Sequence, residues 1–320
     1  MKSEARKISV SGQRFAGEMT SELLDGLSQT PKRIAAKYFY DQRGSELFNA
    51  ITELKEYYIP RVEQSIFARH KLEICAEIGK AKTVVEPGAG SCEKIKWLLP
   101  ELSPSAYIPM DISGSHLQEN ATELSKAYPG LAVNPLIYDH SNGLLLSDEL
   151  PGSALVFFYP GSSIGNFEPE AAVGFMRELR TKMGSTGGLL IGVDSKKDPN
   201  VLHAAYNDCK GVTAAFNLNV LHHLNQLLDG NLNPGCFEHF AFYNKEQGRI
   251  EMHLRCLKDH REILAGTEIE FSAGELINTE FSYKYYPEEF SALAHRSGLR
   301  LKRLWQDEQL YFSVMYFVPE

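Results

Sequence analysis

The stretch Val84-Val85-Glu86-Pro87-Gly88-Ala89-Gly90-Ser91 decides the fold. It begins inside a short apolar strand expected over residues 83–86, and its glycines form a turn before a helix expected over residues 92–99. Glycine has no Cβ, so the backbone of such a turn can approach a ligand closely. The GxG lacks the third glycine of the dinucleotide fingerprint. On its own it is compatible both with a ligand-binding loop and with a simple tight turn.

Apolar strands alternate with helices over residues 82–197. Beyond the first strand, we expect strands at 106–110, 132–138, 154–159 and 188–193, with helices at 114–128 and 168–183. Continuously apolar strands separated by helices indicate an α/β fold with a parallel sheet covered on both faces. Ligands of such sheets bind at the carboxyl ends of the strands.

Acidic residues mark the ends of the first three expected strands. Glu86 lies just ahead of the GxG, Asp111 ends the second strand, and Asp139-His140 ends the third. Asp111 can accept hydrogen bonds from ribose hydroxyls, and the Asp139-His140 pair can hold an adenine amino group. This ordered series favours S-adenosylmethionine as the cofactor, with a nicotinamide or another nucleotide as the alternative.

The periodicity changes after residue 198. The rest of the chain is expected to hold a helical region at 199–229, a hairpin at 237–244 and 249–257, a strand at 268–271, a helix at 287–297, and strands at 300–305 and 309–318. The closing helix and strand pair resemble the end of a class I methyltransferase sheet. We therefore predict a class I (Rossmann-like) methyltransferase core with an inserted α+β substrate-binding domain. The predicted core is 61–197 plus 286–320, and the predicted cap is 1–60 plus 198–285.

Composition excludes several classes of protein. The 320 residues carry a formal net charge of -8, which does not suit a nucleic-acid or anionic-membrane partner. Five dispersed cysteines without CxxC spacing argue against a disulfide framework or a zinc site. No apolar run reaches the roughly 18 residues that span a bilayer. We expect a cytoplasmic monomer that binds a small molecule and no metal.

Several motifs together resemble the histidine-specific Nα-methyltransferases of ergothioneine biosynthesis. The resemblance covers about residues 37–317. The motifs that carry it are Lys37-Tyr38-Phe39-Tyr40-Asp41, Gly44-Ser45-Glu46-Leu47-Phe48, Glu56-Tyr57-Tyr58, Gly88-Ala89-Gly90-Ser91-Cys92-Glu93-Lys94, Gly161-Ser162-Ser163-Ile164-Gly165-Asn166, Tyr206 followed by Gly211-Val212-Thr213-Ala214-Ala215-Phe216-Asn217, Ile250-Glu251-Met252 and Thr279-Glu280-Phe281-Ser282. The cofactor loop departs from some members at Pro87 and Cys92, which bears on cofactor affinity and not on function.

The resemblance implies a role for each matched position. The residues expected to contact the cofactor are Tyr40, Gly88, Lys94, Asp111, Asp139 and His140. The residues expected to hold the histidine are Tyr57, Asn166, Tyr206, Met252, Glu280 and Ser282. Asn166 and Tyr57 are the expected catalytic residues, and the expected reaction is stepwise methylation of the α-amino group of free L-histidine to the trimethylated betaine hercynine.

Three other functions are weighed against this one. A methyltransferase of the same fold could act on another amine, such as a tryptophan-derived one, although Glu280 and Met252 argue against a bulky indole. A cofactor-binding regulator without activity would be expected to lack Asn166, Tyr57 or the GxG, and all three are present. A nucleic-acid methyltransferase would need a basic groove and an NPPY-type loop, where this chain has Pro160-Gly161-Ser162-Ser163-Ile164-Gly165-Asn166.

Overall fold

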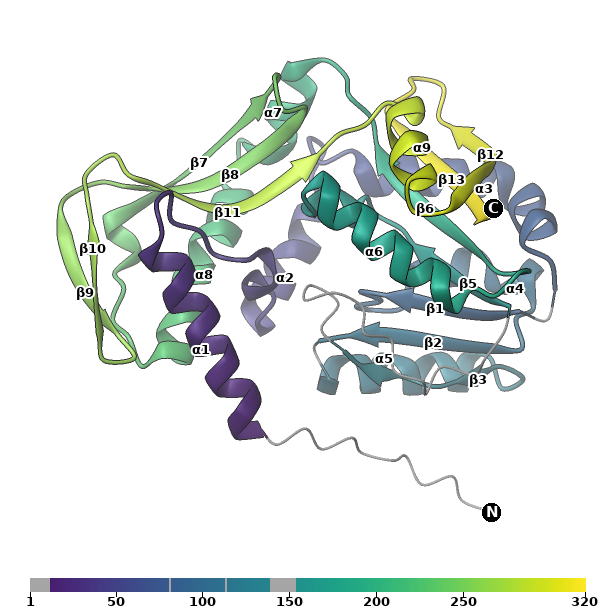
Figure 1. The fold of residues 1–320 in the computed structure, drawn as a ribbon, viewed down its shortest axis with the longest axis horizontal. Helices are drawn as coiled ribbons and strands as arrows, with labels where there is room; N and C mark the ends of the chain where they lie inside the picture. The colour runs from purple at the N-terminus through teal and green to yellow at the C-terminus, as the bar shows by residue number, and fades with distance from the viewer. Residues whose placement is uncertain (1–11, 81, 113, 139–153) are drawn as a thin grey trace. The chain divides into compact units, whose positions relative to one another are not determined.

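A computed structural model of the protein describes residues 12–80, 82–112, 114–138 and 154–320 (Figure 1). The chain divides into two compact units. The first unit is drawn from Met1–Phe48, Cys209–Ala241 and Glu251–Glu280, and the second from Asn49–Asp208, Phe242–Ile250 and Phe281–Glu320. These bounds differ from those of the predicted core and cap. That one part is the methyltransferase core and the other a substrate-binding cap stays a prediction.

The second unit is built on one sheet. Its strands are β1 (Thr83–Pro87), β2 (Ala106–Asp111), β3 (Ala132–Val133), β4 (Leu136–Ile137), β5 (Leu155–Tyr159), β6 (Gly188–Asp194), β12 (Leu299–Gln306) and β13 (Phe312–Pro319). Among the described residues the order is β12-β13-β6-β5-β1-β2-β3, with β4 also paired to β2. The strands from β3 to β6 pair in parallel, whereas β13 runs antiparallel to both β6 and β12. The predicted α/β fold class is confirmed.

Helices cover both faces of this sheet because its strands are apolar on both sides. Leu189, Ile191 and Val193 of β6 belong to a buried cluster with apolar residues of α6 (Pro169–Lys182) and α9 (Pro287–His295). Figure 1 shows α6 running along the sheet. Side chains alternate along a strand, so Gly192 faces the opposite side. A Cβ built on Gly192 would lie 2.6 Å from a carboxylate oxygen of α3 (Ile59–Ile78), which places α3 on that second face.

Prolines explain two differences from the predicted elements. The predicted helix at 92–99 is wrong: the chain forms the 3-10 turn η2 (Lys94–Trp97) and then the short helix α4 (Leu99–Leu102), with Pro100 in its first turn. The predicted strand at 132–138 is divided into β3 and β4. Pro135 lies between them and has no N–H to donate to a neighbouring strand.

A glycine interrupts the predicted helical region at 199–229. That region consists of α7 (Pro199–Tyr206) and α8 (Val212–Leu228). Gly211 caps α8 with φ +72°, a left-handed conformation that glycine adopts without a steric cost. The helix that follows β2 is α5 (Gly114–Ala127), which contacts β2 and β3 and matches the helix predicted over 114–128.

The first unit combines helices with a small hairpin. Its elements include α1 (Gly12–Ser28), η1 (Ala36–Phe39), α8, η5 (Pro234–Cys236), β9 (His260–Leu264) and β10 (Thr267–Phe271), and α2 (Gln42–Thr52) starts in it. The strand β9 was not predicted and pairs antiparallel with β10. A separate three-stranded sheet has the order β11-β8-β7, and its strands β7 (Phe237–Asn244), β8 (Arg249–Cys256) and β11 (Leu276–Tyr283) each contain residues of both units. None of the helices in the described segments has the length and apolar character needed to cross a bilayer.

Candidate active site

The glycine turn after β1 is tied to the end of β2. Gly88 and Gly90 have φ values of +69° and +50°, which side chains rarely allow. The amide of Gly90 donates a 2.9 Å hydrogen bond to Oδ2 of Asp111, and the amide of Ala89 donates to the carbonyl of Met110 at 2.9 Å. The predicted cofactor residues Gly88 and Asp111 therefore lie together at the carboxyl end of the parallel strands.

The acidic residue ahead of the glycines is turned into the protein. Glu86 is buried, and the hydroxyl of Tyr107 donates to its Oε2 at 2.6 Å. Burial raises the pKa of Glu86 to about 8, so the group is uncharged at neutral pH. Cys92 in the same loop has no exposed surface, and burial raises the pKa of its thiol to about 12. Glu86 thus supports the loop from within.

Lys94 is held by a carboxylate that the sequence did not single out. Its Nζ lies 2.7 Å from Oε2 of Glu63, which comes from α3 and has no exposed surface. Oε1 of Glu63 accepts a 2.7 Å hydrogen bond from the amide of Gly161, in the loop after β5. Gly161 has φ +81°, and a Cβ there would come within 2.6 Å of the Lys94 Nζ. Glu63 therefore joins the cofactor loop to the loop that leads to Asn166.

The described structure does not test the other three predicted cofactor residues, Asp139, His140 and Tyr40, at the glycine turn. Asp139 and His140 lie outside the described residues. Tyr40 belongs to the first unit, where its ring packs 5.7 Å from that of Phe48 and 5.9 Å from that of Phe216. Its role at the cofactor stays a prediction.

The second unit brings together three of the six predicted histidine-binding residues, and it also contains Asn166. The rings of Tyr57 and Tyr206 are 6.3 Å apart, edge to face, and the hydroxyl of Tyr206 donates to Oγ of Ser282 at 2.9 Å. Asn166 ends the 3-10 turn η4 (Ser163–Asn166). The preceding residue, Gly165, lies against β11, since a Cβ there would be 2.7 Å from the carbonyl oxygen of Tyr283.

The other two predicted substrate residues belong to the first unit. Met252 lies on β8 with 1% of its surface exposed, and Nδ2 of Asn278 donates to its carbonyl at 3.1 Å. Glu280 is half-buried on β11, two residues before Ser282. Alternation along the strand points Glu280 and Ser282 to the same face.

A buried cluster of charges next to Ser282 was not predicted. Asp194 at the end of β6 lies 3.0 Å from Nζ of Lys284 and 2.5 Å from Nζ of Lys197, and these three side chains are between 0% and 4% exposed. Burial alone would raise the pKa of Asp194, but the two ammonium groups outweigh burial and hold that pKa below its usual value. Burial lowers the pKa of Lys197 to about 8 despite the charge of Asp194.

Tyr58 is a member of this cluster. The sequence gives no reason to treat it as more than a packing aromatic, but its hydroxyl lies 2.8 Å from both carboxylate oxygens of Asp194. Burial, followed by the charge of Asp194, raises the pKa of Tyr58 well above its usual value, so the hydroxyl stays protonated and donates. Tyr57 and Tyr58 therefore belong to two neighbouring groups of site residues.

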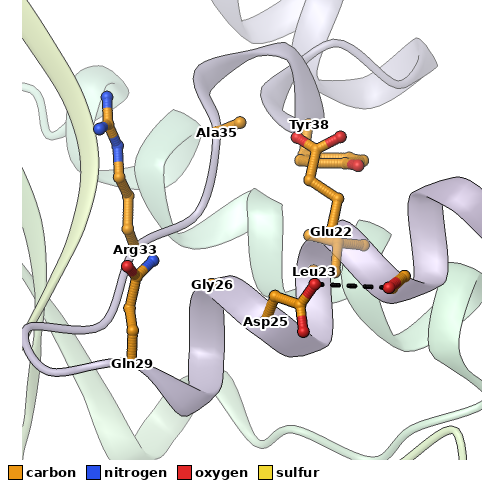
Figure 2. A pocket seen from close by; sticks show the side chains of 9 residues that line it. Glu22, Leu23, Asp25, Gly26, Gln29, Arg33, Ala35 and Tyr38 are labelled. Atoms are coloured by element: carbon orange, nitrogen blue, oxygen red, sulfur yellow. Dashed lines mark hydrogen bonds between the residues drawn. The ribbon is translucent and has the colours of Figure 1, made fainter.

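A surface pocket of the first unit contains none of the predicted site residues in its described lining. The pocket has a volume of about 630 Å³, and Figure 2 shows Glu22, Asp25, Gln29, Arg33 and Tyr38 around it. Most of these side chains come from α1 and the segment that follows it.

The chain belongs to the class of S-adenosylmethionine-dependent methyltransferases, as its family model shows. The CcbJ methyltransferase from Streptomyces caelestis has a similar fold, with a TM-score of 0.50 at 13% identity over 80% of this chain and 96% of that one. Within this class, the chain belongs to the family of histidine-specific, S-adenosylmethionine-dependent methyltransferases, whose family model matches residues 19–319.

Two bacterial relatives are similar over almost their full length. The histidine N-alpha-methyltransferase of Mycobacterium tuberculosis is 37% identical over 294 residues, which cover 90% of each chain. The protein of the same name from Mycolicibacterium smegmatis is 38% identical over 290 residues, covering 88% of this chain and 89% of the relative. These likenesses confirm that the chain is an enzyme and that S-adenosylmethionine is its cofactor.

Proposed function

We propose that the protein methylates the α-amino group of free L-histidine, stepwise to the trimethylated betaine hercynine. The observation that carries this proposal is the group formed by Tyr57, Tyr206 and Ser282 in the second unit, in a chain of the histidine-specific family. Tyrosine and serine hydroxyls can donate to and accept from the polar ends of a small amino acid. A small polar group of this kind suits a free amino acid better than a nucleic acid.

The residues near the glycine turn fit S-adenosylmethionine. The carboxylate of Asp111, fixed by the amide of Gly90, suits ribose hydroxyls, and the ammonium of Lys94 suits the carboxylate of the methionyl part. We assign further cofactor contacts to Gly88, and to Tyr40 and the Asp139-His140 pair on the strength of the family motifs alone. When bound, the cofactor supplies a methyl group on a sulfonium, which an amine lone pair can displace.

The protein has to present a neutral amine in line with that methyl group, so its contribution is mainly positioning and the exclusion of water. Across the described segments, the side chain of Asn166 makes no hydrogen bond, and its carbonyl oxygen can accept an N–H of the substrate amine. Tyr57 adds a phenol beside Tyr206. The buried carboxylates Glu63 and Asp194 are occupied by lysines, so the amine proton leaves to solvent or through polar groups.

The imidazole ring accounts for the selectivity that we propose. A neutral imidazole has one N–H donor and one acceptor nitrogen. Glu280 accepts the donor, Ser282 complements the acceptor, and Met252 supplies apolar surface to the ring. A site built for such a hydrogen bond rejects an analogue without it by roughly 10⁴-fold, because its own polar group is left unpaired.

We also propose that the enzyme acts as a cytoplasmic monomer, with the predicted cap holding part of the histidine.

The experiment that tests this function is mass spectrometry of the purified protein with S-adenosylmethionine and a panel of free amino acids. We expect histidine alone to gain one, two and three methyl groups. Turnover of tryptophan or another amine without methylation of histidine would keep the cofactor and overturn the proposed substrate.

The role of Asn166 is tested with variants. Asn166→Ala should lower kcat by roughly 100-fold, the loss typical of removing one positioned polar group, with little change in cofactor binding. Asn49→Ala, at an exposed position of α2, is the matched control. Full activity in Asn166→Ala or Asn166→Asp would exclude the proposed orientation of the amine.

A further inference from the structure

The hydroxyl oxygen of Ser282 already accepts two hydrogen bonds. A serine hydroxyl has two lone pairs and one hydrogen. Tyr206 donates to Oγ at 2.9 Å, and Nζ of Lys284 donates to it at 2.7 Å. Both lone pairs are therefore occupied, and only the hydrogen of Ser282 is left for another partner.

The same lysine also donates to Tyr206. Nζ of Lys284 lies 3.3 Å from the hydroxyl oxygen of Tyr206, and an ammonium can only donate. Tyr206 accepts from Lys284 and donates its own hydrogen to Ser282. The three groups form a chain of donors that runs in one direction, from Lys284 to Ser282.

Lys284 is anchored so that it keeps this orientation. Its ammonium lies 3.0 Å from Oδ2 of Asp194, and neither side chain has any exposed surface. Asp194 is in turn held by Tyr58 and Lys197. Lys284 follows β11 directly and is two residues after Ser282, so both side chains point to one face.

The hydrogen of Ser282 has no acceptor in the part of the chain that the structure describes. The serine is 4% exposed, so water is largely kept from it. A buried donor without a partner costs free energy, about 1–3 kcal/mol in general. An arrangement that is satisfied only when an acceptor arrives points to a ligand.

We propose that Lys284 is a positioning residue that, together with Tyr206, fixes Ser282 as a donor toward the substrate. The substrate atom it meets has to be an acceptor, and the unprotonated ring nitrogen of a neutral imidazole is that atom. This inference rests on the proposed function, since it describes how the histidine ring is recognised. Lys284 itself does not touch the substrate.

A double-mutant cycle tests whether Lys284 acts through Ser282. Ser282→Ala and Lys284→Met should each raise KM for histidine at least tenfold, with the Kd for S-adenosylmethionine within twofold of the unchanged protein. The double variant should be no worse than Ser282→Ala within twofold. If the rises in KM of the two single variants multiply in the double variant, Lys284 acts independently of Ser282 and the proposal is overturned. Lys196→Met, which removes a partly exposed lysine paired with Glu289, is the matched control.

A substrate analogue tests the same inference on the unchanged protein, in case Lys284→Met fails to fold. Pyrrolylalanine keeps a ring N–H but has a CH in place of the acceptor nitrogen. We expect its KM to exceed that of histidine at least tenfold, and the difference to disappear in Ser282→Ala. Equal KM values in a protein that methylates histidine would overturn the role of Ser282 as a donor to the ring. Failure to methylate histidine at all would instead contradict the proposed function.

Discussion

The ammonium of Lys94 lies 2.7 Å from a carboxylate oxygen of Glu63, whose side chain has no exposed surface while that of Lys94 is 32% exposed. The other oxygen of Glu63 accepts from the amide of Gly161. One carboxylate on α3 thus fixes a side chain of the cofactor loop and the backbone of the loop leading to Asn166. The loop that we assign to the cofactor and the loop that leads to Asn166 both depend on this one group.

Removal of Glu63 should therefore affect stability and cofactor binding together. Glu63→Ala leaves a lysine and a partly buried amide without their acceptor, and we expect a loss of about 1–3 kcal/mol in the free energy of unfolding. The Kd for S-adenosylmethionine, measured by calorimetry, should rise because Lys94 is no longer held. Glu93→Gln is the control, since Glu93 pairs with Lys96 in the same loop but is exposed, and such pairs contribute about 0–1 kcal/mol. Equal effects of the two variants would contradict the role given to Glu63.

Asp111 should contribute to cofactor affinity through both of its tasks. In Asp111→Ala, the amide of Gly90 loses its acceptor and the ribose loses its carboxylate. We expect the Kd for S-adenosylmethionine to rise by roughly 10- to 100-fold, which corresponds to about 1.4–2.8 kcal/mol. Asp111→Asn keeps an oxygen that can accept from Gly90, so its Kd for S-adenosylmethionine should lie between those of the parent protein and Asp111→Ala. Unchanged binding in Asp111→Ala would remove Asp111 from the cofactor site.

Glu86 should make the stability of the enzyme depend on pH. Its pKa is about 8 in the folded protein against an ordinary value of 4.5, so the unfolded chain ionises first as pH rises. Stability from this group is therefore full below pH 4.5 and is lost between about pH 4.5 and pH 8, by up to about 1.4 kcal/mol per pH unit.

Glu86→Gln isolates that contribution, because the amide stays neutral and can still accept from Tyr107. The free energy of unfolding should be measured with urea at several pH values. As pH rises over this range, the variant should become increasingly more stable than the parent. Glu119→Gln, at an exposed position of α5, should give parallel curves. A constant difference for Glu86→Gln would mean that Glu86 is ionised throughout.

Gly165 should tolerate no side chain. A Cβ there would lie 2.7 Å from the carbonyl oxygen of Tyr283, so Gly165→Ala has to displace either β11 or the turn that ends at Asn166. We expect a loss of about 1–3 kcal/mol in stability and a lower kcat, with little change in cofactor affinity. Gly174→Ala on α6 has open space around it and should be neutral or stabilising, by up to about 1 kcal/mol. Retention of kcat in Gly165→Ala would show that this contact does not position Asn166.

Local sequence was sufficient to predict the sheet. Continuous apolar segments and the glycine turn mark β1, β2, β5 and β6, and the strand ends locate Asp111 beside Gly90 because parallel strands share one edge. The division at Pro135 was missed because the apolar segment continues through it. The predicted helix ended at residue 99, whereas Pro100 favours a helix that starts there, as α4 does.

The buried charges could not be predicted from local pattern. Glu63 lies in a helix rich in polar residues, where a carboxylate is usually solvated, and its partners are 31 and 98 residues away in the sequence. Asp194 and Lys284 meet only because β6 and the end of β11 are brought together by the fold. The one local signal for Lys284 is its spacing. It follows Ser282 by two residues and Glu280 by four, so all three would share one strand face.

Burial of Cys92 also has a chemical consequence. Oxidants and alkylating reagents attack the thiolate, and a thiol with a pKa of about 12 and no exposed surface presents almost none. Of the five cysteines, Cys209 is the exposed one. Peroxide or a maleimide should therefore react at Cys209, and the glycine turn after β1 keeps its sulfur intact in an oxidising environment.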